Sequence, residues 1–163
     1  MKKLILLTFI LLPWVVFSQE TNQAEKLKMM VGTWRTDLST FKSTIPGFTS
    51  LPDHKVVCKE VTDGSINCKY FMIDANGNLI LSQSELFAYD QATNKVYNMT
   101  FEGPNVRFGY LSFDGNLMNW TQTDVDGNVI QGGTMLVKPQ EMNINSKMAD
   151  GSGTVSYTYK REE

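Results

Sequence analysis

The chain has 163 residues, of which 20% are charged, and its 15 Lys and Arg against 17 Asp and Glu give a net charge of −2. This weakly acidic balance, without clusters of basic residues, argues against binding to nucleic acid or to anionic membrane surfaces. The length suffices for one domain with a substantial hydrophobic core.

The first 18 residues have the pattern of an export signal. Lys2 and Lys3 precede an apolar run from Leu4 to Phe17, which is too short to span a bilayer because about 20 residues are needed. We expect cleavage after Ser18 and a secreted or periplasmic protein. Since both lysines leave with the signal, the 15 basic residues fall to 13 against 17 acidic ones, and the mature net charge is about −4.

A short helix is expected next, within residues 19–30. Asn22 can cap its first turn, and Ala24, Leu27 and Met30 recur at helical spacing. Such a helix would cover one mouth of a barrel formed by the strands that follow.

Residues 31–163 have the pattern of one all-β domain. Strand-like segments alternate with turn signals such as Asp63-Gly64 and Asn76-Gly77, at a spacing of roughly 8–12 residues. Short loops make neighbouring strands antiparallel, and a meander of about ten strands hides its edges most readily by closing on itself. The sequence therefore predicts a closed antiparallel up-and-down barrel of about ten strands with a short N-terminal helix.

One connection, Lys42 to Asp53, is longer than the others and carries Ile45, Phe48 and Leu51. A loop of this length inside a compact domain is often functional. Two interpretations stay open: the loop takes part in function, or its apolar side chains simply seal one end of the barrel.

Both cysteines fall in one predicted hairpin. A three-residue loop, Thr62 to Gly64, would pair Val61 with Ser65. Counting outward along both strands then places Cys58 directly opposite Cys68. That pairing brings the two Cα atoms within the range of a disulfide, and export to an oxidising compartment favours its formation. The alternative is two free buried thiols or a metal-binding pair.

Three stretches of the sequence are similar to a known group of barrels. A short helix runs into "VGTW" at Val31–Trp34, "FAYDQATNKVYNMTFEG" spans Phe87–Gly103, and "YTYKRE" follows at Tyr157–Glu162. With this pattern the chain resembles the lipocalin-like (calycin) β-barrels. It is most similar to the uncharacterised bacterial lipocalin-like families that carry an N-terminal Gly-Thr-Trp.

The resemblance implies a structural role for the Gly-x-Trp motif. In such barrels, a tryptophan of the first strand packs under a basic residue of the last strand, which here would be Arg161 or Lys160. Gly32 would clear space at the crowded start of the first strand. A guanidinium over an indole ring is favourable by about 0.5–2 kcal/mol, so we expect Trp34 to plug one end of the barrel.

Residues suited to catalysis or to holding a cofactor are scarce. Some barrels of this shape, the nitrobindin-like proteins, hold haem through a histidine on a late strand, but the sole histidine here, His54, follows the long loop. A nucleophilic Ser or Cys would have only that histidine as a base. Glu60 and Glu85 lie within strands, on faces that the pattern does not determine. We therefore expect no enzymatic activity, no cofactor and no metal site.

Candidate ligand-binding residues come from strand faces that mix methionine and aromatic side chains with polar ones, which suits a cavity for a partly apolar ligand. They are Tyr97, Met99, Phe101, Arg107, Met118, Trp120 and Gln122. Arg107 could anchor an acidic group of the ligand. Each of these residues could instead lie in an ordinary core or on the exterior.

The sequence thus predicts a secreted or periplasmic barrel that binds a small, partly apolar molecule in its interior. The alternative is a non-enzymatic protein-interaction or scaffold barrel that binds a protein partner through the 42–53 loop. Neither prediction involves nucleic acid or a membrane span.

Overall fold

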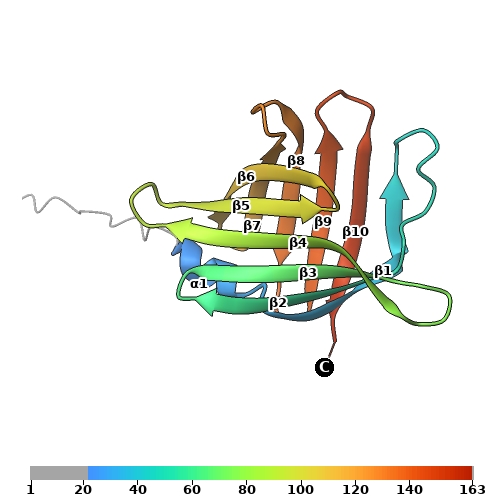
Figure 1. The fold of residues 1–163 in the computed structure, drawn as a ribbon, viewed down its shortest axis with the longest axis horizontal. Coiled ribbons are helices and arrows are strands. Elements are labelled where there is room, and N and C mark those ends of the chain that lie inside the picture. Colours follow the sequence, from blue (N-terminus) through green and yellow to red (C-terminus); the bar gives the residue numbers. More distant parts are fainter. Residues whose placement is uncertain (1–21, 163) are drawn as a thin grey trace, which may run out of the picture.

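The computed structural model describes residues 22–162, which form one closed β-barrel with a short helix at one end (Figure 1). Ten strands follow one another around the barrel in chain order, each antiparallel to its neighbours, and the first strand pairs with the last. The predicted fold class is therefore confirmed. The predicted signal segment, residues 1–18, and its cleavage after Ser18 lie outside the described residues.

The helix is α1 (Gln23–Lys28). The strands are β1 (Gly32–Ser43), β2 (His54–Thr62), β3 (Ser65–Ile73), β4 (Leu79–Asp90), β5 (Lys95–Glu102), β6 (Asn105–Asp114), β7 (Leu117–Thr123), β8 (Val129–Val137), β9 (Glu141–Met148) and β10 (Thr154–Arg161). Within residues 22–162, no helix is long and apolar enough to cross a membrane.

Helix α1 begins where the sequence predicts a cap, because the Glu25 backbone N–H donates to the side-chain oxygen of Asn22 over 3.3 Å. With six residues, the helix is shorter than the predicted 19–30 segment. It docks on β6, where the Gln23 side chain donates to the Phe113 carbonyl over 3.1 Å and accepts from the Phe113 N–H over 2.7 Å. These bonds hold the helix over one end of the barrel.

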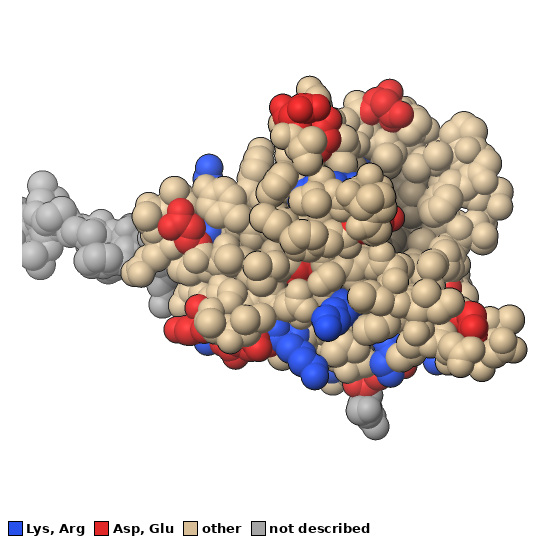
Figure 2. Space-filling model, viewed as in Figure 1, with Lys and Arg blue, Asp and Glu red and all other residues tan. Residues whose placement is uncertain are grey.

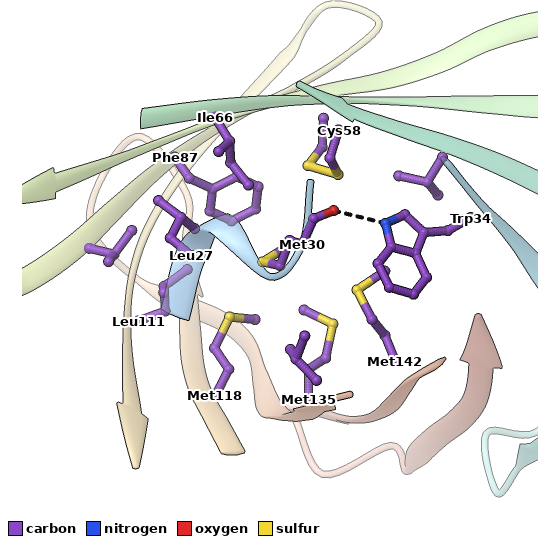
Figure 3. Packing of buried hydrophobic residues seen from close by; sticks show 14 of the residues in the cluster. Leu27, Met30, Trp34, Cys58, Ile66, Phe87, Leu111, Met118, Met135 and Met142 are labelled. Carbon is purple, nitrogen blue, oxygen red and sulfur yellow. Dashed lines mark hydrogen bonds between the residues drawn. A yellow bond between two sulfur atoms is a disulfide. The ribbon is translucent and has the colours of Figure 1, made fainter. Parts of the chain in front are cut away.

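Trp34 plugs the barrel at the helix end, as the resemblance implies. Its side chain is fully buried, and its indole Nε1 donates to the Met30 carbonyl over 2.8 Å (Figure 3). The guanidinium carbon of Arg161 lies 4.1 Å from the centre of the indole ring. The basic partner is thus Arg161 rather than Lys160, whose ammonium pairs with Glu141 over 2.6 Å.

Gly32 leaves the space that this arginine occupies. Its φ of +143° lies in a region that favours glycine, and a Cβ atom there would collide with Nη1 of Arg161. The same guanidinium donates to the backbone carbonyls of Val31 and Met29, over 2.9 and 3.1 Å. Arg161 therefore ties the last strand to the segment that joins α1 and β1.

Cys58 and Cys68 form a disulfide between β2 and β3, which confirms the predicted pairing. Both residues are buried, and Cys58 borders the barrel interior. The hairpin turn differs from the predicted one, because a β-bulge near its tip pairs Ser65 with Thr62 rather than with Val61. The bulge lies beyond the cysteines, so their pairing is unaffected.

Candidate functional site

A cavity of about 790 Å³ occupies the barrel interior, within the range of small-molecule sites, which is about 300–1,000 Å³. Its walls come from β2 to β10, since successive side chains of each strand alternate between the interior and the outer surface. Helix α1 and Trp34 close one end. At the opposite end, the loop between β1 and β2 borders the cavity.

Methionine side chains form the apolar floor of the cavity, next to the helix. Met30 follows α1, and Met118, Met135 and Met142 come from β7, β8 and β9. Figure 3 shows the four side chains converging, with Met142 beside the Trp34 ring. Because methionine is flexible and polarizable, such a floor adapts to apolar groups of different shapes.

The loop of residues 44–53 contributes apolar side chains to the opposite end of the cavity. Those that border it include Ile45, Phe48 and Leu51. The Phe48 ring packs edge-on against Phe41, with 5.6 Å between ring centres, and remains 37% exposed. The loop is therefore part of the cavity wall, and one aromatic side chain on it is also open to solvent.

A chain of hydrogen bonds runs along the cavity wall from β3 to β8. The Glu85 carboxyl on β4 accepts from the Tyr70 hydroxyl over 2.7 Å and from the Thr100 hydroxyl over 2.8 Å. Gln122 donates to Thr100 over 2.9 Å and accepts from Gln131. Since Glu85, Thr100 and Gln122 are all buried, the network fixes their orientation.

Burial controls the ionisation of the groups around this network. Loss of water raises the pKa of Glu85, while hydrogen bonds from Tyr70 and Thr100 act in the opposite direction. Burial also raises the pKa of Tyr157 to about 12 and moves the pKa values of Tyr70 and Tyr159 well above their usual range. The three tyrosines are therefore neutral hydrogen-bond donors near neutral pH.

Further ionisable groups border the part of the cavity away from the helix. Arg107 of β6 and Glu102 of β5 form an ion pair over 2.6 Å. His54 of β2 also borders the cavity, and burial lowers its pKa, which favours the neutral imidazole. The ion pair and the neutral imidazole leave this region with little net charge.

The structure brings four of the seven candidate ligand residues to the cavity wall. They are Arg107, Met118, Trp120 and Gln122. Their contact with a ligand stays a prediction. Arg107 in particular is engaged by Glu102, so an acidic ligand group would have to compete with that carboxylate.

The prediction that Tyr97, Met99 and Phe101 line the interior is wrong. Tyr97 is 44% exposed and Phe101 is 45% exposed on the outer surface. On β5 the inward positions belong to Thr100 and its alternate neighbours, because Thr100 pairs with Glu85 on the adjacent strand and joins the buried network. The more polar face of this strand is thus the inner one.

The structure also shows where the side chains of the two strand glutamates lie, which the sequence pattern does not determine. Glu85 points inward, whereas Glu60 is exposed and its carboxylate lies 3.8 Å from the Lys28 ammonium. Tyr70 and Tyr157 border the cavity and were not among the candidates. Most polar residues of the site were therefore not among the ligand-binding residues predicted from the sequence.

The outward side chains of β4, β5 and β6 form an apolar patch. Its exposed members include Leu86, Tyr97, Phe101, Phe108 and Tyr110. The middle of this face carries few charged atoms, while Lys and Arg gather along the edge over β2 and β3 (Figure 2). This patch is an apolar surface separate from the cavity, so a binding experiment has to distinguish the two.

No protein-family model matches the sequence, and neither does any curated protein. Solved structures are similar in fold. The S-type phycobiliprotein lyase CPES from Guillardia theta has a TM-score of 0.55 at 15% identity, with 89% of this chain and 96% of that chain covered. The fold is that of a lipocalin-like barrel. Wild-type fluorescent protein UnaG has a TM-score of 0.51 at 12% identity, with 83% of this chain and 99% of that chain covered. At such identities the similarity concerns the fold alone.

Proposed function

We propose that this protein binds a small, partly apolar molecule inside its barrel and does not catalyse a reaction on it. The observation that carries the proposal is the cavity of about 790 Å³, which combines a methionine floor with one buried polar network. Mostly apolar walls with a few fixed polar groups are typical of small-molecule sites.

The fold alone does not select this function. A phycobiliprotein lyase and a fluorescent protein share the fold, so different functions are built on it and the choice rests on the site. Two kinds of side chain that could act as nucleophiles, cysteine thiols and hydroxyl groups, already have other partners in this structure. Cys58 and Cys68 are joined in a disulfide, and Tyr70 and Thr100 hold the Glu85 carboxyl. This favours binding over catalysis.

We further propose that the protein is secreted or periplasmic and belongs to the bacterial lipocalin-like families with an N-terminal Gly-Thr-Trp. The disulfide supports an oxidising compartment. The packing of Arg161 on Trp34, with Gly32 leaving room for it, supports the family assignment.

A cavity-filling substitution tests the proposal. Ser146 and Lys147 are neighbours on β9, and Ser146 borders the cavity whereas Lys147 is exposed on the outer surface. We expect Ser146→Trp to weaken binding of N-phenyl-1-naphthylamine, a neutral apolar dye, by about tenfold or more. The Lys147→Trp control should keep the wild-type affinity to within about twofold. Fluorescence titration measures both.

Two results would contradict the proposal: unchanged dye affinity in Ser146→Trp, or no saturable dye binding by the wild-type protein. The second result would favour the alternative function, a protein-interaction barrel acting through the 42–53 loop. The partial exposure of Phe48 is the observation on which that alternative rests.

A further inference from the structure

We infer that the ligand is an amphipathic organic cation, whose ammonium group binds at the Glu85 carboxylate while its apolar part extends over the methionine floor. This inference rests on the proposed binding of a small molecule in the cavity. It adds the charge and the chemical class of that molecule.

The first support is the charge of the cavity wall. Among the described residues that border the cavity, the charged types are Glu85, Glu102 and Arg107, together with His54. Arg107 and Glu102 neutralise each other at 2.6 Å, and burial favours the neutral form of His54. Glu85 makes no ion pair within residues 22–162, and the charge of Arg107 acts on it less than burial and the hydrogen bonds do, so its carboxyl has no counter-charge in direct contact.

The second support is the way in which the Glu85 carboxyl is held. Each of its oxygens accepts one hydroxyl hydrogen bond, from Tyr70 on β3 and from Thr100 on β5. The Gln83 side chain also contributes a hydrogen bond to this carboxyl. Since the two carboxylate oxygens offer about four acceptor positions, acceptor capacity remains for a ligand. Two donors from different strands orient it beforehand, which reduces the entropy lost on binding.

The third support is that a bound cation would offset the cost of burying the ionised Glu85 carboxylate. Removal from water disfavours the ionised form of Glu85 and raises its pKa. An ammonium group at hydrogen-bond distance supplies a counter-charge in direct contact with the carboxylate and brings its own N–H donors. A carboxylate ligand at the same place would instead be repelled.

Aromatic rings complete a site for a cation. Tyr70, Tyr157, Tyr159 and Trp120 lie in the same cavity wall. The Tyr157 and Tyr159 rings meet edge-on at 5.3 Å, and the Tyr70 hydroxyl donates directly to Glu85. Ring faces attract cations in sites shielded from water.

The test uses three probes that share a dodecyl chain and differ only in the head group: dodecylammonium, 1-dodecanol and dodecanoate. Each displaces N-phenyl-1-naphthylamine from the wild-type protein at pH 7, below its micelle-forming concentration. We expect dodecylammonium to bind about tenfold or more tightly than either other probe. This comparison needs no substitution, so it decides the inference even if a variant fails to fold.

Matched variants then identify the residue that causes the preference for dodecylammonium. Glu85→Gln keeps the size of the side chain and removes its charge, and should abolish the preference for dodecylammonium over 1-dodecanol, measured as the ratio of the two affinities within this variant. Glu60→Gln removes an exposed carboxylate at the helix end of the barrel, 3.8 Å from the Lys28 ammonium, and should keep the full preference. Glu102→Gln frees Arg107 and should raise dodecanoate affinity.

The outcomes separate this inference from the proposed function. Tighter binding of dodecanoate than of dodecylammonium, or a preference that survives in Glu85→Gln, would overturn the inference while leaving ligand binding intact. If neither the dye nor any of the three probes bound the wild-type protein, the proposed function itself would fail.

Discussion

Replacing Trp34 with alanine should lower the free energy of unfolding by about 3–5 kcal/mol, as truncation of large buried aromatic residues does. The indole is fully buried, and its Nε1 donates to the Met30 carbonyl. It also supports the Arg161 guanidinium, 4.1 Å from its ring. The substitution would therefore leave a void and loosen the closure between β1 and β10.

Chemical denaturation measures this loss, and Trp34→Phe serves as the control. Phenylalanine retains much of the apolar volume but has no N–H to donate to Met30, so its effect should be clearly smaller than that of alanine. A stability close to wild type in Trp34→Ala would contradict the role of this side chain as the plug of the barrel.

The second large effect is expected from removing the disulfide. Cys58 and Cys68 are separated by 10 residues, and closing a loop of that size restricts the unfolded chain by about 2–3 kcal/mol. The double variant Cys58→Ala, Cys68→Ala should lose about that much stability. The loss should appear as a lower midpoint in chemical denaturation.

Reduction provides the matched control for this prediction. A reductant should lower the stability of the wild-type protein and leave that of the double variant unchanged. Titration of thiols in the unfolded, unreduced protein should detect none. Two titrating thiols would contradict the disulfide and support the alternative of free cysteines.

The closed barrel and its plug were predictable because they follow from local rules. Regular turn signals and short loops predict a meander, and closing it removes the exposed edges. The Trp34–Arg161 contact came from the resemblance of the two chain ends to known barrels. The cysteine pairing follows from counting outward from one hairpin turn. The predicted pairing at the tip of that hairpin is wrong, but the β-bulge responsible lies between the tip and the cysteines, where the register is as predicted.

The inner face of β5 was not predictable from the strand alone. Alternation shows that Tyr97, Met99 and Phe101 share one face, but it does not say which face is inside. The neighbouring strands decide this, because Thr100 pairs with Glu85 and completes a buried network. On β5, the common assumption that the more apolar face is inner fails, because this part of the cavity wall carries polar groups.

The face of Glu85 was not predictable from its strand either. Glu85 stands two positions before Phe87, so the two share a face, but Leu86 lies on the opposite face, and the apolar pattern does not decide between them. In the structure Phe87 is almost fully buried, so this face is the inner one. The partners of Glu85, Tyr70 and Thr100, lie far from it in sequence, and only the closed topology brings them together.

The most direct test of the interior binding site is the NMR spectrum of methionine methyl groups during titration with N-phenyl-1-naphthylamine. Met118, Met135 and Met142 border the cavity, whereas Met99 lies on the outer face, paired with Leu86 of the apolar patch. The same chain thus carries probes of both surfaces. We expect saturable shifts at the three inner methyl groups and none at Met99. Shifts confined to Met99 would place binding on the outer patch and contradict a ligand site inside the barrel.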